Sequence, residues 1–549
     1  MSNEQARTCL DVALVVFVVA LALRLVPLLW SPLPATLDGF GYASLAHETV
    51  TQTLPLYRIG ADEFVLTVGL AMVSEVIGME PRTAVQPFAA MVGAAAPVVA
   101  STLAYVLGRE LQWSRQRLRL VTALVGFSLA IQGLFLRRTG EPDEETVGLL
   151  LVPILAYVAH QMFVTRDQRW MGLTAIFIFV FPFLHNLSAT VAVLTVTALV
   201  FLHVTKELSR DSIILGGSFV GGFWLWFWGY FELAESAGLR ISFSGLFRDH
   251  PGLLLAWIVV LIIGVVWFRG TSKQLQRATF LLSIGSWFVI VIVNVFTPIF
   301  PGTVPSPPLI TLGLIMFLIP VILASRALPI VRVSDTGALV LSLVAAPIAL
   351  TYYALTAELT PQHFVAVVRM QTFAHLSVFL LAGFAVTKYA LPTTTVSRWR
   401  QALGGTAVSL FVITLLVTAP LGYVNLDTGS YPSTTMESEF QAATFATTHV
   451  NGTFASDHTI SNIATDYANS ENATMAPTIE WLRGNPRPRC AFVSQTSWTT
   501  TGAHLYPAGP ETVTTARHSQ LLATSNLVYT TGGHDPLYLT VPRSGSETC

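Results

Sequence analysis

The feature that most constrains this chain is a series of long apolar segments that recurs from Val12 to Pro420. Each segment is about 17 to 22 residues long, enough for a helix to cross a hydrocarbon core of about 30 Å. Lipid offers the backbone no hydrogen-bond partners, so such segments must be helical. The chain is 53% hydrophobic and only 11% charged, whereas a soluble domain carries about 25% charged residues. These features predict an α-helical polytopic membrane protein.

After residue 420 the composition changes to threonine, serine, asparagine, glycine and proline. We therefore divide the chain into a transmembrane domain, residues 1–420, and a water-soluble domain, residues 421–549. Cys490 and Cys549 both lie in the second domain, where the sequence leaves open whether they pair. Apolar runs between turn signals predict an α+β domain. Its strands are expected at 489–494, 527–531 and 537–541, and its helices at 438–449 and 478–483.

The apolar segments predict about 13 transmembrane helices. The first external loop, residues 31–84, is long and contains an amphipathic stretch, 40–51, and a short apolar stretch, 64–79, both of which we expect to lie on or dip into the outer face of the membrane. The spans are expected near 12–30, 85–107, 120–136, 146–164, 171–187, 188–204, 212–230, 252–268, 279–297, 309–325, 336–356, 371–387 and 402–420.

The arginine and lysine residues predict the orientation, because positive charge in short loops marks the cytoplasmic side. Alternate loops carry these residues, for example the loop with Arg109 and Arg115 and the loop with Lys388 and Arg398. A cytoplasmic N-terminus places every basic loop inside, and an odd number of spans then places the C-terminal domain outside. We expect a multi-pass protein of the cell membrane with an extracellular C-terminal domain.

The charge distribution argues against two classes of function. The net charge is −1, so the chain has no basic surface for nucleic acid. No Asp or Glu lies at the midplane of a predicted span, where an acid usually marks an ion or proton path. This absence disfavours a proton-coupled transporter. A flippase for lipid-linked glycans, or another transporter, stays open as an alternative.

Acidic residues gather at the outer ends of the spans. Asp38 follows the first span, and Glu141 and Asp143 lie in a second acidic loop, residues 137–146. Acids from separate loops at one membrane depth can converge on one cavity, where a carboxylate can act as general base. We predict these three as catalytic residues and as the candidate ligands of Mg²⁺ or Mn²⁺. The simpler interpretation of the second loop is a helix start, with Pro142 in the first turn and acids that complement the helix dipole.

Basic and aromatic residues share the predicted outer face. Arginines there can bind a lipid phosphate through charge-assisted hydrogen bonds, or can simply anchor helices at the interface. Tyr42, on a predicted surface helix, and His185, between two spans, are the candidate substrate-binding residues. The candidate lipid-phosphate ligands are Arg24, Arg58, Arg137, Arg138 and Arg369.

Two short motifs then resemble a known superfamily. The run from Arg24 to Pro27, followed by Asp38-Gly39-Phe40-Gly41-Tyr42, resembles the opening of the GT-C membrane glycosyltransferases. Glu141-Pro142-Asp143 resembles the second-loop acidic motif of the oligosaccharyltransferase branch. The resemblance covers the organisation of most of the chain, with sequence signatures in residues 20–150. It implies a GT-C fold and a sugar donor linked to dolichyl or another polyprenyl phosphate.

The resemblance also bears on the reaction. The oligosaccharyltransferase branch carries a Trp-Trp-Asp motif in its outer domain, whereas Trp481 and Trp498 stand apart in this chain. The closest group is therefore the archaeal dolichol-phosphate-mannose mannosyltransferases. This implies transfer of a single mannose, with inversion, to a glycan on the outer face, such as the N-glycan of a surface-layer (S-layer) glycoprotein. Transfer of a whole lipid-linked glycan to asparagine by an oligosaccharyltransferase is the alternative.

Overall fold

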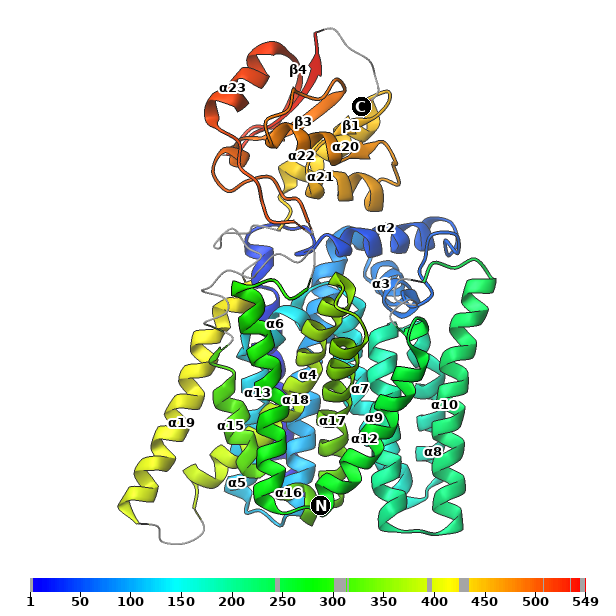
Figure 1. Ribbon diagram of the computed structural model, residues 1–549, viewed down its shortest axis with the longest axis vertical. Helices are drawn as coiled ribbons and strands as arrows, with labels where there is room; N and C mark the ends of the chain where they lie inside the picture. The colour runs from blue at the N-terminus through cyan, green and yellow to red at the C-terminus, as the bar shows by residue number, and fades with distance from the viewer. Residues whose placement is uncertain are drawn as a thin grey trace.

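The computed structural model describes residues 3–549 apart from 242–246, 301–312, 314, 393–396, 424–433, 507, 534 and 544–548. A bundle of long helices carries a smaller domain of helices and strands at one end (Figure 1). We call this end of the bundle the domain side. The N-terminus lies at the opposite end of the bundle (Figure 1).

The helices of the bundle begin where the sequence offers caps. Asp143 caps α7 and Ser334 caps α17, each by accepting a hydrogen bond from a backbone N–H of the first turn. The bundle contains α1 (Asn3–Arg24), α4 (Pro81–Glu110), α5 (Arg115–Ile131), α6 (Gly133–Gly140), α7 (Glu144–Thr165), α8 (Gln168–Val180), α9 (Asn186–Lys206), α10 (Arg210–Ser236), α12 (Pro251–Gly270), α13 (Lys273–Phe296), α15 (Leu318–Ala327), α16 (Ile330–Val333), α17 (Asp335–Ala357), α18 (Pro361–Ala390) and α19 (Arg398–Thr418), with short 3₁₀ turns η1 (Val26–Leu29), η2 (Phe181–Phe183) and η3 (Ala419–Tyr423).

Within the described residues, nine helices are long and apolar enough to cross a membrane. The count is ten if α5 and α6, which meet at 67°, form one bent span. The chain is therefore a helical multi-pass membrane protein, but the count falls short of the predicted 13. The remaining predicted spans fall on α1, on the 13 residues of α8 and on the 10 residues of α15. Much of the first half of the predicted span 309–325 lies outside the described residues.

The helices differ in how deeply they lie within the bundle. The apolar windows of α9 and α17 are 83% and 78% buried within the protein, so these helices form its centre. The windows of α10 and α12 are only 22% buried. Their apolar side chains therefore face outward, which is favourable only in contact with lipid.

Two shorter helices lie at the domain side of the bundle. Helix α2 (Asp38–Thr51) runs across the top of the bundle, and α3 (Phe64–Ile77) lies beneath it (Figure 1). Both match the stretches for which the sequence predicts surface helices. Helix α2 separates the bundle from the C-terminal domain.

The C-terminal domain is built on a mixed sheet of five strands in the order β2-β1-β3-β5-β4. Strand β1 pairs in parallel with β2 and β3, and β5 pairs antiparallel with β3 and β4. Cys490, just before β3, forms a disulfide with Cys549. The strands are β1 (Phe454–Ala455), β2 (Ala473–Thr474), β3 (Ala491–Gln495), β4 (Ser525–Thr530) and β5 (Leu537–Pro542); the helices are α20 (Glu437–His449), α21 (His458–Asn462), α22 (Ala476–Leu482), α23 (Thr515–Thr524), the π-helical turn η4 (Ile463–Tyr467) and the 3₁₀ turn η5 (Thr496–Thr499).

The first loop of the bundle and the C-terminal domain share one hydrophobic core. Leu33, Leu37 and Phe40 pack into the same buried cluster as Phe440 of α20. The rings of Phe40 and Phe440 stack with their centroids 5.8 Å apart, and Tyr467 of η4 meets Phe40 edge-on at 6.2 Å. The position of α2 is therefore fixed from both sides, by the bundle below and by the domain above.

Candidate active site

A polar cavity of about 480 Å³ lies at the domain side of the bundle. Its wall comes from α2, the loop that follows α2, the start of α7, the residue before α9, α18 and the turn η4 of the C-terminal domain. Six predicted site residues line this cavity: Asp38, Tyr42, Arg58, Asp143, His185 and Arg369. The other lining residues are Gly41, Leu45, Tyr57, Asp62, Glu63, Glu144, Arg240, Thr465, Asp466 and Asn469.

Helix α2 brings Asp38 to the cavity. Asp38 is its first residue, where a negative charge complements the helix dipole. The next residue, Gly39, packs against Pro142 of the acidic loop, and a Cβ at Gly39 would lie 3.2 Å from the Pro142 Cβ. Gln86 of α4 holds the two loops together, because it accepts from the Ala35 N–H (3.0 Å) and donates to the Gly140 carbonyl (2.8 Å).

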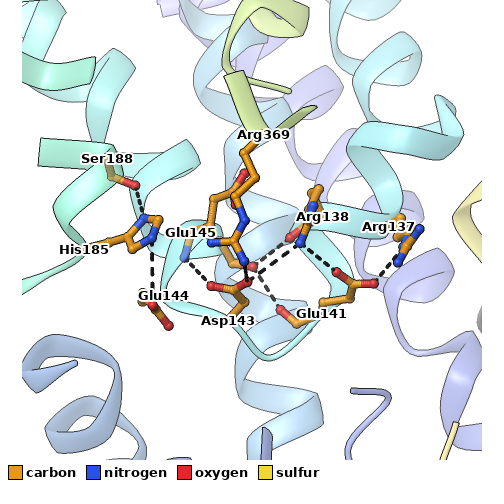
Figure 2. Close-up of polar contacts among 10 residues, drawn as sticks. Arg137, Arg138, Glu141, Asp143, Glu144, Glu145, His185, Ser188 and Arg369 are labelled. Atoms are coloured by element: carbon orange, nitrogen blue, oxygen red, sulfur yellow. Dashed lines mark hydrogen bonds and ion pairs between the residues drawn. The ribbon is translucent and has the colours of Figure 1, made fainter. Parts of the chain in front are cut away.

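The second acidic loop is built by a sharp bend. Helix α5 ends, α6 turns by 67°, and α7 begins at Glu144 with Asp143 as its cap. The Asp143 carboxylate accepts from the Glu145 N–H at 2.9 Å. Its other oxygen, Oδ2, lies 3.8 Å from Arg138 and 4.0 Å from Arg369. One oxygen of Asp143 therefore faces two cations, as Figure 2 shows.

Arg369 enters the site from α18, which lies far along the chain from the acidic loop. Its guanidinium also lies 3.6 Å from the buried carboxylate of Glu145. The Arg369 Nε makes no hydrogen bond to any described residue. Arg369 is thus held by charge rather than by close hydrogen bonds, and because it lines the cavity it is suited to bind an additional anion there.

The two carboxylates of the cavity have different proton affinities. The pKa of Asp38 is raised to about 6, first because the surrounding protein removes water from the carboxyl and then because Asp143 is negatively charged. The side chain is nevertheless open to the cavity. Burial acts to raise the pKa of Asp143 too, but Arg369 and Arg138 outweigh it and hold that pKa below its ordinary value. Asp143 therefore stays ionised near neutral pH, whereas Asp38 gains or loses its proton at a pH of about 6. Such a pair is typical of acid–base sites.

Four predicted residues lie outside the cavity lining. The Glu141 carboxylate turns to Arg137 (2.8 Å) and Arg138 (3.4 Å). Arg24 is buried and donates to Thr139 at 3.0 Å. These contacts of Glu141 and Arg24 stabilise the acidic loop. The roles that the sequence assigns to these residues stay predictions.

Arg58 lines the cavity but already has partners. It forms an ion pair with Glu48 and donates to the Asp466 carbonyl at 3.0 Å. Because Asp466 belongs to the C-terminal domain, Arg58 also ties the first loop to that domain.

Sequence reasoning missed several residues of the cavity. Asp62 and Glu63 follow α2 within the predicted first loop, and Arg240 pairs with Glu63 at 2.9 Å. Adjacent acids in an outer loop were a signal that could have identified Asp62. The contribution of Thr465 and Asp466 gives no such signal, because it depends on how the C-terminal domain sits on α2.

A divalent cation was predicted at Asp38, Glu141 and Asp143. Across the described ranges, no three His, Cys, Asp or Glu side chains lie close enough to hold a metal ion. Glu141 faces Arg137 and Arg138, as described above, rather than Asp38. The residues as arranged here do not fit a metal, so we derive no step through one, and the metal requirement stays a prediction.

Comparison with known proteins adds the fold. No protein-family model and no curated protein matches this sequence. Among solved structures, oligosaccharyltransferase AglB of Archaeoglobus fulgidus, in complex with an inhibitory peptide and a dolichol-phosphate, matches with a TM-score of 0.51 and 13% identity over 87% of this chain. This chain is structurally similar to AglB, a GT-C membrane glycosyltransferase.

The likeness is one of fold, at low identity, and this chain covers 65% of the length of AglB. Two further structures of the A. fulgidus oligosaccharyltransferase match with 13% identity. One is tethered to an acceptor peptide with the NVT sequon (TM-score 0.48; 84% of this chain and 63% of that chain). The other is a complex with Zn and sulfate (TM-score 0.46; 83% and 61%).

Proposed function

We propose that this chain is a membrane glycosyltransferase that takes a sugar from a polyprenyl-phosphate carrier and attaches it to an acceptor on the domain side. The observation that carries the proposal is the cavity itself. It joins a carboxylate whose pKa is raised to about 6, Asp38, to an ionised one, Asp143, and to the guanidinium of Arg369. A base and an anion site in one cavity are what transfer from a lipid phosphate requires.

In the proposed reaction Asp38 accepts the proton of the acceptor group as that group attacks the anomeric carbon of the donor sugar. A bond forms from the acceptor atom to the anomeric carbon, and the bond from that carbon to the carrier phosphate breaks. The phosphate leaves with the electron pair, and Arg369, which lines the same cavity as Arg58, stabilises the negative charge. A single displacement of this kind inverts the configuration of the sugar.

The ligands of AglB support the choice of substrates. That protein binds a dolichol-phosphate and a peptide. By analogy, we propose a dolichyl- or polyprenyl-phosphate-linked donor and a protein or glycan acceptor for this chain.

The likeness to AglB favours the oligosaccharyltransferase form of the reaction, in which a whole glycan passes to asparagine. One observation favours the single-mannose form that the sequence predicts. Trp481 and Trp498 are 3% and 1% exposed and pack in the core of the C-terminal domain, so neither is free to contact an acceptor. No observation favours the flippase or transporter alternative.

We propose that the domain side faces the outside of the cell. The Cys490–Cys549 disulfide supports this orientation, because such bonds persist in oxidising surroundings. The N-terminus lies at the other end of the bundle (Figure 1), where the rule on basic loops places the cytoplasm.

The proposal is tested by glycan mass spectrometry of surface proteins in a strain that lacks the gene. We expect loss of the whole N-glycan if asparagine is the acceptor, and loss of one terminal hexose if a glycan is. Re-expression of the natural chain should restore the glycan, and re-expression of the Asp38→Ala variant should not. Unchanged glycans in the deletion strain would overturn the proposal.

A further inference from the structure

One wall of the cavity is polar but carries no cation. Asp62 lies in the loop after α2, and its Oδ2 accepts from the N–H of Asn186 at 3.3 Å. The preceding residue, His185, lies 3.8 Å from Glu144. Figure 2 shows these two side chains pointing toward each other. Asp62, Asn186, His185 and Glu144 thus form a continuous polar wall, of which Asp62, His185 and Glu144 line the cavity directly.

This wall contains polar atoms without partners. Asp62 is 2% exposed and Asn186 is 4% exposed. The Asp62 Oδ1, both amide atoms of the Asn186 side chain and the Glu144 Oε2 make no hydrogen bond to any residue that the structure describes. Buried polar atoms left unpaired cost free energy, so native proteins almost always pair them with protein, water or ligand. Two of these atoms, the Asp62 Oδ1 and the Glu144 Oε2, belong to residues that line the cavity, and a ligand rich in hydroxyl groups is suited to pair with them.

The charge of the wall excludes a phosphate as that ligand. Burial lowers the pKa of His185 to about 3, so this imidazole is neutral at physiological pH. Nothing in the wall then balances the charge of an anion. The cation suited to bind an anion is Arg369, which lies outside this wall and pairs with Asp143 and Glu145. A sugar hydroxyl, which donates to a carboxylate and accepts from an amide, fits this wall.

We propose that Asp62, Asn186, His185 and Glu144 form the subsite that binds the hydroxyl groups of the transferred sugar. The inference rests on the proposed function and adds the position of the sugar to it. Arg369 binds the carrier phosphate, and this wall binds the neutral hexose next to that phosphate. The subsite therefore selects the sugar, whereas the arginine side of the cavity selects the carrier.

The test compares two lipids on the purified full-length chain. Dolichyl phosphate carries no sugar, and dolichyl phosphate mannose carries one. We expect the natural chain to bind the mannose lipid more tightly than dolichyl phosphate. Asp62→Asn keeps an acceptor for the Asn186 N–H but loses the charge. It should weaken binding of the mannose lipid by about tenfold or more and leave binding of dolichyl phosphate unchanged.

Two variants make the result specific. Asn186→Ala removes both unpaired amide atoms and should likewise reduce the preference for the mannose lipid. Glu75→Gln removes an exposed acid of α3 outside the cavity and should change neither affinity. Thermal unfolding of each variant shows whether it is folded.

The outcomes separate this inference from the proposed function. Equal binding of the mannose lipid by folded Asp62→Asn and by the natural chain would overturn the inference alone. A natural chain that binds both lipids with equal affinity would also overturn it, since the wall would then hold only water. A natural chain that binds neither lipid would overturn the proposed function, and the inference with it.

Discussion

Gly39 lies directly against the ring of Pro142, so that the backbone at the start of α2 and the acidic loop meet with only that ring between them. A Cβ at Gly39 would lie 3.2 Å from the Pro142 Cβ and 2.5 Å from the Pro34 Cβ. This contact sets how closely Asp38 approaches Asp143 across the cavity.

Gly39→Ala should therefore reduce transfer more than it reduces stability. The added methyl group cannot fit beside Pro34 without moving the backbone, and a displacement of about 1 Å in an active site can cost on the order of 100-fold in rate. The check is the rate of sugar transfer by the purified variant. Gly221→Ala in α10 is the matched control, because a Cβ there meets nothing within 4 Å. Transfer at the natural rate by Gly39→Ala would contradict the proposed geometry.

The rate of transfer should rise with pH through about 6. Asp38 must be ionised to accept a proton, and its pKa is raised to about 6, first by burial and then by Asp143. The stability of the folded protein should change with pH in the opposite direction to the rate. The raised pKa means that the stability linked to Asp38 is present at low pH and is lost as the pH rises through about 6.

Asp143→Asn tests the assignment of this titration. Removal of the Asp143 charge should lower the pKa of Asp38, and so should shift the midpoint of the kcat/KM profile of any residual activity to lower pH. The pKa of Asp62 is also raised to about 6, mainly by burial. Asp62→Asn should therefore leave the midpoint in place. If the midpoint shifts in Asp62→Asn but not in Asp143→Asn, the titrating carboxylate is Asp62, and the assignment to Asp38 is wrong.

Arg369→Gln should abolish tight binding of dolichyl phosphate. The variant also removes one of the two cations, Arg369 and Arg138, that act on the buried carboxylate of Glu145, and the loss of one partner of a buried ion pair destabilises a protein by about 3–5 kcal/mol. The double variant Arg369→Gln/Glu145→Gln removes both charges. It should recover much of the thermal stability but none of the binding. Recovery of binding in the double variant would show that Arg369 acts only as a structural partner of Glu145.

Phe40→Ala should loosen the C-terminal domain from the bundle. Phe40 is fully buried between the two parts and stacks on Phe440. Truncation of a buried Phe costs about 3–5 kcal/mol, and Phe40→Leu should cost much less. Hydrogen exchange of α2 and α20 measures the effect, with faster exchange in both helices as the expected result. Faster exchange confined to α2 would mean that the domain is held by other contacts.

Reduction of the Cys490–Cys549 disulfide should lower the unfolding temperature of the C-terminal domain. The bond closes a loop with a sequence separation of 59, for which the chain-entropy model gives a contribution of roughly 4 kcal/mol. Cys549→Ser should reproduce the effect of a reducing agent and should not respond to it further. Thermal unfolding with and without the reducing agent measures both. Cys9, a free cysteine of α1, provides the control variant Cys9→Ser.

Local sequence patterns predicted the elements of this fold better than their number or arrangement. The expected strands at 489–494, 527–531 and 537–541 correspond to β3, β4 and β5, because turn residues bound each run. The short parallel strands β1 and β2 escaped prediction, since two residues make no periodic pattern. Among the described residues nine or ten helices are long and apolar enough to span, against 13 predicted, because hydropathy alone does not separate a full span from a short apolar helix such as α8.

The candidate site shows the same limit. Asp38 and Asp143 stood out because acids are rare near the spans, and they line one cavity. Glu141 stood out for the same reason, yet it turns to Arg137 and Arg138. Glu141 follows the 67° bend between α5 and α6, where Gln132 caps α6. The rarity of acids near the spans does not specify which way its side chain turns after that bend.

Helix α2 presents its first residue, Asp38, to the cavity and its third, Phe40, to the core of the C-terminal domain. The outer domain therefore helps to position Asp38, the proposed base, and cannot be exchanged like an independent module. A chimera with a foreign domain would need an aromatic ring in the place of Phe440 to keep α2 in position. A chain cut after residue 423 would expose Leu33, Leu37 and Phe40 to water. We expect its bundle to stay folded while Asp38 loses its fixed position in the cavity.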